Sequence, residues 1–286
     1  MLDLAIAYRI YPGVSKAPAL FPTDKLGLAE ICLRSFKRAL GKLRIKMWVL
    51  LDGCPPEYES LFRRMFRPDE LEIVSLNGVG NGATFSLQID LLTRQAEAAH
   101  VYFAEDDYFY FPHALEQMLA FMRHHPDVDF VTPYDHPDSY YTSSHWERHR
   151  VRPYGERYWR TASSTCLTFL TSREVLLQTA SMFRSYSSGN GDCPLWLALT
   201  QKLSLADPRI HWHNLPRVKI WAKTWIWGFR RILLGRRYRL WAPLPTLATH
   251  MESSCLAPLI DWQNVFLEAE EQQLKTGEYR KLSAFS

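Results

Sequence analysis

The stretch that decides the fold is residues 100–112, which read HVYFAEDDYFYFP. Residues 101–104 are apolar, mostly β-branched or aromatic, and predict a short buried strand. Three adjacent carboxylates, Glu105, Asp106 and Asp107, follow at the carboxyl end of that strand. Carboxylates this close repel one another and are poorly solvated beside an apolar strand, which favours a bound cation, and oxygen ligands suit Mg²⁺ or Mn²⁺. An acidic solvated loop or the start of a helix is the alternative.

The rest of the first 110 residues alternates strand-like and helix-like segments. Strands are predicted at residues 4–7, 46–51, 71–76 and 101–104, and helices at residues 25–40, 55–66 and 83–98. This alternation is typical of a parallel sheet with helices on its faces. We therefore expect an α/β fold in which the acids lie at the edge of the sheet where ligands bind.

The second half is expected to extend the sheet. Strands are predicted at residues 128–133 and 161–171, and helices at residues 174–182 and 262–275. Between them, residues 134–158 form a long polar and aromatic loop, and a loop of this length is usually functional or mobile. Its aromatic side chains suit sugar rings, but ordinary packing in surface structure is the alternative.

A glycine-rich turn, residues 77–82 (NGVGNG), follows the third predicted strand. Glycines between a strand and a helix let the backbone approach a phosphate group. The spacing differs from the dinucleotide fingerprint, and the turn follows the third strand rather than the first, so nicotinamide or flavin binding is not expected. A turn that contacts a ligand and a turn of purely structural use both remain open.

The composition is that of an ordinary globular protein. Of 286 residues, 47% are hydrophobic and 22% charged, and a net charge of +4 does not by itself imply nucleic acid. The five cysteines show no paired spacing, which favours reduced thiols in the cytoplasm. The sequence shows neither a signal peptide nor an apolar run of roughly 20 residues, so we expect a protein that is neither secreted by that route nor integral to a membrane.

Together these features resemble the nucleotide-binding half of a GT-A glycosyltransferase, most closely the family 2 inverting enzymes. The features are the alternating strands and helices, Asp52 at the end of the second strand, the glycine-rich turn and the acidic cluster. In that family a D-x-D motif holds a divalent metal against the diphosphate of a sugar nucleotide. Glu105, Asp106 and Asp107 match the motif.

The resemblance implies a role for each matching residue. It implies that Asp107 and Glu105 contact Mn²⁺ or Mg²⁺. The implied donor contacts are Tyr8 and Arg9 beside the base and ribose, Asp52 on the base, and Asn81, Gln88, Glu105 and Asp106 elsewhere on the donor.

Two later residues complete the implied site. Asp192 lies 85 residues after Asp107 (192 minus 107), an interval similar to that between the metal motif and the catalytic base in the family. The alternative is that Asp192 only caps the helix that Pro194 begins. His250 matches a late histidine that completes the metal shell in many GT-A enzymes, and the alternative is an ordinary packed or exposed histidine.

Residues 217–241 contain eight basic residues and no acid, with tryptophans near helical spacing. This pattern predicts an amphipathic basic helix. Such a helix suits the surface of an anionic membrane. Nucleic acid is the rival partner, and a helix with a solvated basic face is the simplest alternative.

We therefore expect a GT-A-like, Rossmann-like domain over residues 1–260, with a nucleotide-binding half (1–110) and an acceptor half (111–260), then a C-terminal helix and tail (261–286). The expected activity is metal-dependent, inverting transfer of a sugar from a nucleotide sugar, UDP-linked, to a saccharide or lipid-linked acceptor, as in bacterial-type surface glycan or glycolipid assembly. A nucleotidyltransferase or sugar-nucleotide hydrolase is the alternative, and a non-catalytic carbohydrate-binding protein is third. We expect a cytoplasmic protein, peripheral at the inner membrane surface, without a nucleic-acid partner.

Overall fold

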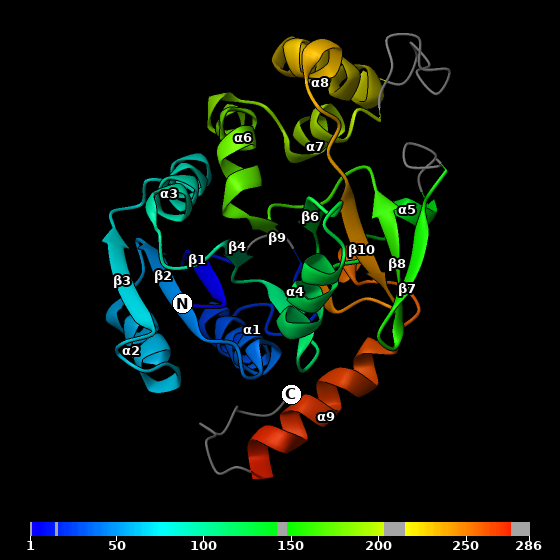
Figure 1. Ribbon diagram of the computed structural model, residues 1–286. Helices are drawn as coiled ribbons and strands as arrows, with labels where there is room; N and C mark the ends of the chain where they lie inside the picture. The colour runs from blue at the N-terminus through cyan, green and yellow to red at the C-terminus, as the bar shows by residue number, and fades with distance from the viewer. Residues whose placement is uncertain (1, 15–16, 142–147, 203–214, 276–286) are drawn as a thin grey trace.

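The computed structural model describes residues 2–14, 17–141, 148–202 and 215–275 (Figure 1). In this part of the chain one large sheet has the strand order β3-β2-β1-β4-β9-β6-β10-β8-β7. Its strands are β1 (Leu4–Ile10), β2 (Ile45–Asp52), β3 (Leu71–Leu76), β4 (His100–Glu105), β6 (Phe130–Val131), β7 (Val151–Tyr154), β8 (Arg157–Ala162), β9 (Phe169–Ser172) and β10 (Leu240–Leu244). A separate two-stranded sheet pairs β5 (Tyr108–Tyr110) with β11 (Ala248–His250).

The half of the large sheet built from β1 to β4 is parallel throughout. All seven residues of β1 are buried, as expected for a parallel strand covered on both faces. The other half is mixed, because β9 runs antiparallel to both β4 and β6, and β8 runs antiparallel to β10 and β7. The predicted α/β fold class is confirmed.

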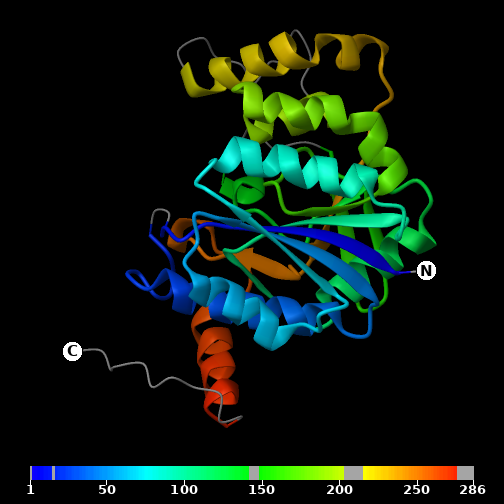
Figure 2. The same ribbon diagram turned by 90° about the vertical axis from the view of Figure 1, so that its left-hand side faces the viewer.

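Helices cover both faces of the sheet in layers (Figure 2). The helices α3 (Asn81–Arg94), α6 (Arg173–Arg184) and α7 (Asp192–Thr200) cover one face, and α8 (Leu215–Leu234) lies outside them. The other face carries α1 (Lys25–Leu40), α2 (Pro56–Met65) and α4 (Ala114–His124). The short α5 (Asp138–Tyr141) lies in the predicted long loop, and α9 (Trp262–Lys275) is the predicted C-terminal helix.

Each face of the sheet has its own hydrophobic core. Successive side chains of a strand point to opposite faces, so Ile6 and Tyr8 enter the core beneath α1 and α2, while Ala5 and Ala7 enter the core beneath α3 and α6. Helix α9 joins the first core through Trp262, whose ring lies 6.5 Å from that of Phe109 between centroids. The division of the chain at residue 260 remains a prediction.

The predicted strand at residues 161–171 is wrong. It is two separate strands, because β8 ends at Ala162 and β9 begins at Phe169, and β6 and β10 lie between them in the sheet. Residues 163–168 read SSTCLT, and Cys166 and Leu167 in this connection line the candidate active site described below. The connection therefore leaves the sheet where a continuous strand was expected.

The predicted basic helix at residues 217–241 is correct only in part. Helix α8 ends at Leu234, and Leu240 and Trp241 belong to β10 in the middle of the sheet. Gly228 lets α8 approach α7, because a Cβ atom at this position would lie 2.5 Å from Cβ of Ala198. In the described part of the chain, every helix is too short or too polar to cross a membrane.

Candidate active site

A pocket of about 740 Å³ lies at the carboxyl ends of β1, β2 and β4. Open α/β sheets bind ligands at this edge, and the volume suits a nucleotide-sized ligand. Eight of the residues predicted from the sequence line it: Arg9, Asp52, Asn81, Glu105, Asp106, Asp107, Asp192 and His250.

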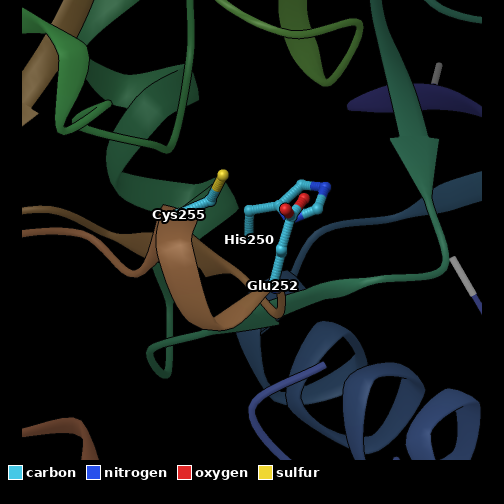
Figure 3. A group of neighbouring side chains, drawn as sticks. All are labelled: His250, Glu252 and Cys255. Carbon is cyan, nitrogen blue, oxygen red and sulfur yellow. The ribbon is translucent and has the colours of Figure 1, made fainter. Parts of the chain in front are cut away.

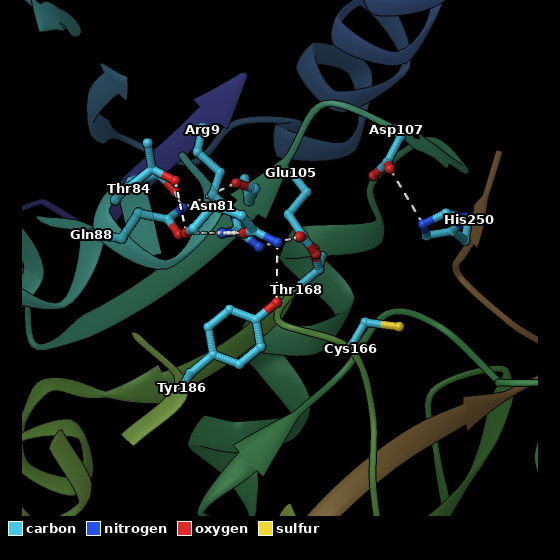
Figure 4. A network of polar contacts seen from close by, with 12 residues as sticks. Arg9, Asn81, Thr84, Gln88, Glu105, Asp107, Cys166, Thr168, Tyr186 and His250 are labelled. Atoms are coloured by element: carbon cyan, nitrogen blue, oxygen red, sulfur yellow. Dashed lines mark hydrogen bonds and ion pairs between the residues drawn. The ribbon is translucent and has the colours of Figure 1, made fainter. Parts of the chain in front are cut away.

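Asp107 and His250 meet although they are far apart in sequence. The pairing of β5 with β11 sets His250 opposite Tyr108, the residue after Asp107. His250 Nε2 then lies 3.3 Å from Asp107 Oδ2 (Figure 4). Burial alone would raise the pKa of Asp107, but the cationic His250, Lys25 and Arg9 outweigh it and lower that pKa to about 2. Burial disfavours the charged form of His250, yet the Asp107 carboxylate raises its pKa.

The Asp107–His250 pair fits a divalent cation. Asp107 Oδ1 is buried and has no hydrogen-bond partner among the described residues, so one carboxylate oxygen remains available to a ligand. His250, Glu252 and Cys255 add a second group of donor atoms, all within 4.8 Å of one another (Figure 3). Each of these two groups combines the His250 imidazole with a carboxylate, and such nitrogen and oxygen ligands suit Mn²⁺-like ions.

Glu105 holds Arg9 in place (Figure 4). One carboxylate oxygen of Glu105 forms an ion pair with Arg9, and the other accepts a hydrogen bond of 2.8 Å from Thr168 Oγ1. Arg9 also donates to the backbone oxygen of Asn81 at 3.0 Å, and Asn81 Nδ2 donates to the Tyr186 hydroxyl at 3.0 Å. A metal contact by Glu105 would require it to leave one of these partners.

Asp106 is buried against Lys25. The distance from Lys25 Nζ to Asp106 Oδ2 is 2.5 Å, and both side chains are almost fully enclosed. Burial would lower the pKa of Lys25, but the Asp106 carboxylate raises it above its ordinary value. Burial also raises the pKa of Asp106, to about 6, although the positive charge of Lys25 opposes this rise. Asp106 thus borders the pocket while its carboxylate faces Lys25, and its predicted donor contact remains a prediction.

Replacing Lys25 by Met is expected to lower the free energy of unfolding by about 3 kcal/mol, because it leaves the buried Asp106 carboxylate unpaired. Urea denaturation at pH 7 measures the change. The matched control is Lys46→Met, which breaks a more exposed pair with Glu72 at 3.8 Å and is expected to cost less than about 1 kcal/mol. Equal losses in the two variants would contradict a special role for the Lys25–Asp106 pair.

Asp52 orders the glycine-rich turn. Its two carboxylate oxygens accept hydrogen bonds from the backbone nitrogens of Val79 (2.7 Å) and Gly80 (2.8 Å). Gly78 and Gly80 have positive φ angles of 69° and 86°, which glycine adopts without strain. The turn therefore lies beside the pocket, and the predicted contact of Asp52 with a base remains a prediction.

Tyr8 and Gln88, two residues with predicted donor contacts, have buried side chains that do not line the pocket, and these contacts remain predictions. Tyr8 is 1% exposed and packs edge-on against the rings of Phe36 and Phe62 in the core. Gln88 is fully buried, and its Nε2 donates to the backbone oxygens of Ala7 (2.6 Å) and Ala104 (3.1 Å), so it ties β1 to β4. Both residues support the sheet beneath the pocket.

Asp192 lines the pocket from the first turn of α7. The cap residue is Gly191, so the alternative in which Asp192 is itself the cap is wrong. Asp192 Oδ1 accepts a hydrogen bond of 2.7 Å from the backbone nitrogen of Cys193. The partial positive charge of a helix N-terminus stabilises a carboxylate at this position.

The sequence analysis missed Lys25, Thr168, Tyr186 and Glu252. Only Lys25 carried a signal: a lysine at the first position of a helix opposes the helix dipole and therefore needs a nearby carboxylate. Thr168 and Tyr186 reach the network through contacts made after the chain has folded.

No protein-family model and no curated protein matches the sequence. Similar solved structures include residues 1–349 of TarS from S. aureus in complex with UDP-GlcNAc, at 12% identity and a TM-score of 0.42, over 63% of this chain and 48% of that chain. Another is the mannosyltransferase PcManGT from Pyrobaculum calidifontis in complex with GDP-Man and Mn²⁺, at 14% identity and a TM-score of 0.40, over 62% and 48%. A third is CMP:2-keto-3-deoxy-manno-octonic acid synthetase complexed with CTP, at 15% identity and a TM-score of 0.39, over 65% and 83%.

The match spans about half the length of the first two of these structures. Function is therefore inferred from the side chains of the pocket.

Proposed function

We propose that the protein is a metal-dependent, inverting glycosyltransferase that moves a sugar from a nucleotide sugar, UDP-linked, to a hydroxyl acceptor. The observation that carries the proposal is the meeting of Asp107, His250 and Asp192 in one pocket at the carboxyl edge of the sheet. The Asp107–His250 pair supplies cation ligands, and Asp192 supplies a carboxylate for proton transfer.

Different side chains of the pocket have different roles in this proposal. Asp52 and the glycine-rich turn that it orders support the nucleoside end of the donor. Arg9, held by Glu105, places a positive charge where a diphosphate would lie. Asp107 and His250, with Glu252 nearby, would hold Mn²⁺ or Mg²⁺, which neutralises charge on the leaving diphosphate when bound.

Asp192 is the proposed general base. As the acceptor oxygen forms a bond to the anomeric carbon, the bond from that carbon to the diphosphate oxygen breaks. The bonding electrons leave with the nucleoside diphosphate, and the acceptor proton passes to Asp192. Attack on the face opposite the leaving group inverts the configuration at that carbon.

The direct test is a thermal-stability screen with UDP-, GDP- and CMP-sugars, each with Mn²⁺ and with EDTA. A ligand that binds the native state raises its melting temperature, so a UDP-sugar with Mn²⁺ should give the largest increase. The nucleotidyltransferase alternative predicts a different product: pyrophosphate released from a nucleoside triphosphate and a sugar substrate. The transferase proposal would be overturned if the protein released pyrophosphate from a nucleoside triphosphate but released no nucleoside diphosphate from a sugar nucleotide.

The outer face of α8 supports contact with an anionic membrane. Ile226, Phe229, Leu233 and Leu234 are exposed there at 68%, 48%, 63% and 87%. The exposed Lys219 and Arg230 lie on the same face, and residues 215–251 contain no acid. Apolar and basic side chains on one helix face suit the boundary between acyl chains and anionic headgroups. A lipid-linked acceptor would then be delivered at that surface.

The basic residues that follow α8 in the predicted segment contact other parts of the same chain. Arg236 and Arg239 form ion pairs with Asp129 and Asp127, and Arg237 Nε donates to the backbone oxygen of Thr200 at 2.9 Å. The proposed membrane contact therefore rests on α8 alone.

Liposome flotation should show the parent protein bound to anionic vesicles and less to neutral ones. The variant Lys219→Glu/Arg230→Glu should bind roughly 30-fold more weakly, because each basic residue near the surface contributes about 1 kcal/mol. Arg64→Glu/Arg94→Glu, with the same charge change on exposed residues of α2 and α3, is the matched control. The proposed membrane contact would be contradicted if the parent protein floated with neither anionic nor neutral vesicles.

A further inference from the structure

A second pocket, of about 570 Å³, shares no lining residue with the candidate active site. Leu240, the first residue of β10, lies in its wall. Strand β10 runs parallel to β6, and β6 and β4 both run antiparallel to β9, so β10 and β4 point the same way. The start of β10 and the end of β4 therefore face opposite edges of the sheet. The two pockets are separate sites.

Cationic side chains converge on this second pocket from two chain segments. Arg148 and Arg150 are alternate residues on the segment that leads into β7, and Arg237 and Arg239 are alternate residues on the segment that leads into β10. Alternate residues of an extended segment share a face. Of the eleven residues that line the pocket, five are Lys or Arg and none is Asp or Glu.

Hydrogen bonds hold two of these arginines, Arg150 and Arg237, in place. Arg150 exchanges hydrogen bonds with Thr161: its nitrogen donates to Thr161 Oγ1 at 3.0 Å, and its oxygen accepts from the Thr161 nitrogen at 2.9 Å. Arg237 is anchored by the bond from its Nε to the Thr200 oxygen, which leaves the two terminal nitrogens of the guanidinium group. Thr161 lines the pocket and is buried, and its hydroxyl hydrogen can be donated to a ligand.

In the described part of the chain, carboxylates balance the charge of the four arginines of this pocket only in part. Arg239 pairs with Asp127, and Asp127 also accepts two hydrogen bonds of 2.7 Å from Arg152. Within the ranges that the structure describes, Arg148, Arg150 and Arg237 have no carboxylate partner. Cations held close together without an anion repel one another, so a bound anion would stabilise this arrangement.

We propose that this pocket binds a phosphate-bearing anion at a site independent of the candidate active site. Planar guanidinium groups match the oxygen geometry of phosphate and bind it through paired hydrogen bonds. The volume exceeds that of a lone phosphate, so the pocket has room for the group that carries it. A phosphorylated sugar and a phospholipid headgroup share this chemistry.

Isothermal titration calorimetry in EDTA tests the proposal with three probes: inorganic phosphate, glucose 6-phosphate and soluble dihexanoyl phosphatidate. At least one probe should bind the parent with a Kd below about 1 mM. The variant Arg148→Ala/Arg150→Ala should bind it at least about tenfold more weakly. The control Arg64→Ala/Arg94→Ala, which removes the same charge from exposed arginines elsewhere, should bind like the parent.

The site should also retain its affinity in Asp107→Ala, because that residue belongs to the other pocket. Preference for glucose 6-phosphate supports a soluble ligand, and preference for the phosphatidate supports a lipid headgroup. Absence of binding by every probe, or equal weakening in the two arginine double variants, would overturn the proposal. Neither result bears on sugar transfer.

Discussion

Asp192→Asn is expected to reduce the rate of sugar transfer at least about a hundredfold, while donor affinity stays close to that of the parent. The amide oxygen can still accept the hydrogen bond from the Cys193 nitrogen, so the start of α7 is preserved. Only the capacity to take a proton is lost, and general base catalysis contributes at least this factor. Steady-state kinetics measures transfer, and calorimetry measures donor binding.

The matched control is Asp69→Asn, which changes an exposed carboxylate that pairs with Arg67 and does not line the pocket. It should transfer sugar like the parent. Transfer by Asp192→Asn within a few-fold of the parent would remove Asp192 from the chemistry and leave it a helix-start residue.

Asp107→Ala is expected to abolish the stabilisation of the protein by UDP and Mn²⁺ together. Removing a cation ligand that also pairs with His250 should weaken metal-dependent nucleotide binding about a hundredfold or more, equivalent to a loss of about 2.7 kcal/mol. Differential scanning fluorimetry with and without Mn²⁺ measures the effect, and circular dichroism checks that the fold persists.

His250→Ala should also reduce the stabilisation by UDP and Mn²⁺, but by less than Asp107→Ala does, because the Asp107 carboxylate is still present. Asp69→Ala again serves as the control. Equal affinity of the parent protein for UDP in Mn²⁺ and in EDTA would contradict metal dependence, whatever the variants do.

The parallel half of the sheet was predictable because its signals are local. The strands β1 and β4 are short continuous apolar runs, and the intervening helices have apolar residues on one side. The connection at residues 163–168 was not predictable. Its residues, SSTCLT, are compatible with a strand by propensity, and the chain leaves the sheet there for reasons of tertiary structure.

The acids of the pocket were predictable because they follow apolar strands or start a helix. The direction in which each side chain points could not be predicted. Tyr8 and Arg9 are neighbours, but strand alternation sends Tyr8 into the core and Arg9 into the pocket, and a register error of one residue reverses that assignment. The Lys25–Asp106 pair likewise depends on how α1 packs against the acidic loop.

The end of helix α8 could not be predicted from the sequence either. Its basic and aromatic composition predicted a helix, but the end of that helix and the departure of the chain into β10 depend on Gly235 and on pairing between β10 and β6. Three of the arginines counted with the helix are therefore engaged elsewhere in the protein.

The pairing of β5 with β11 also makes the proposed cation site dependent on the order in which the chain is synthesised. Asp107 and His250 are 143 residues apart (250 minus 107), and His250 reaches the carboxylate only after β11 has paired. On the ribosome, a nascent chain that ends anywhere before β11 has the acidic loop without its imidazole. The proposed cation site is therefore completed late in synthesis, after the parallel half of the sheet has already emerged.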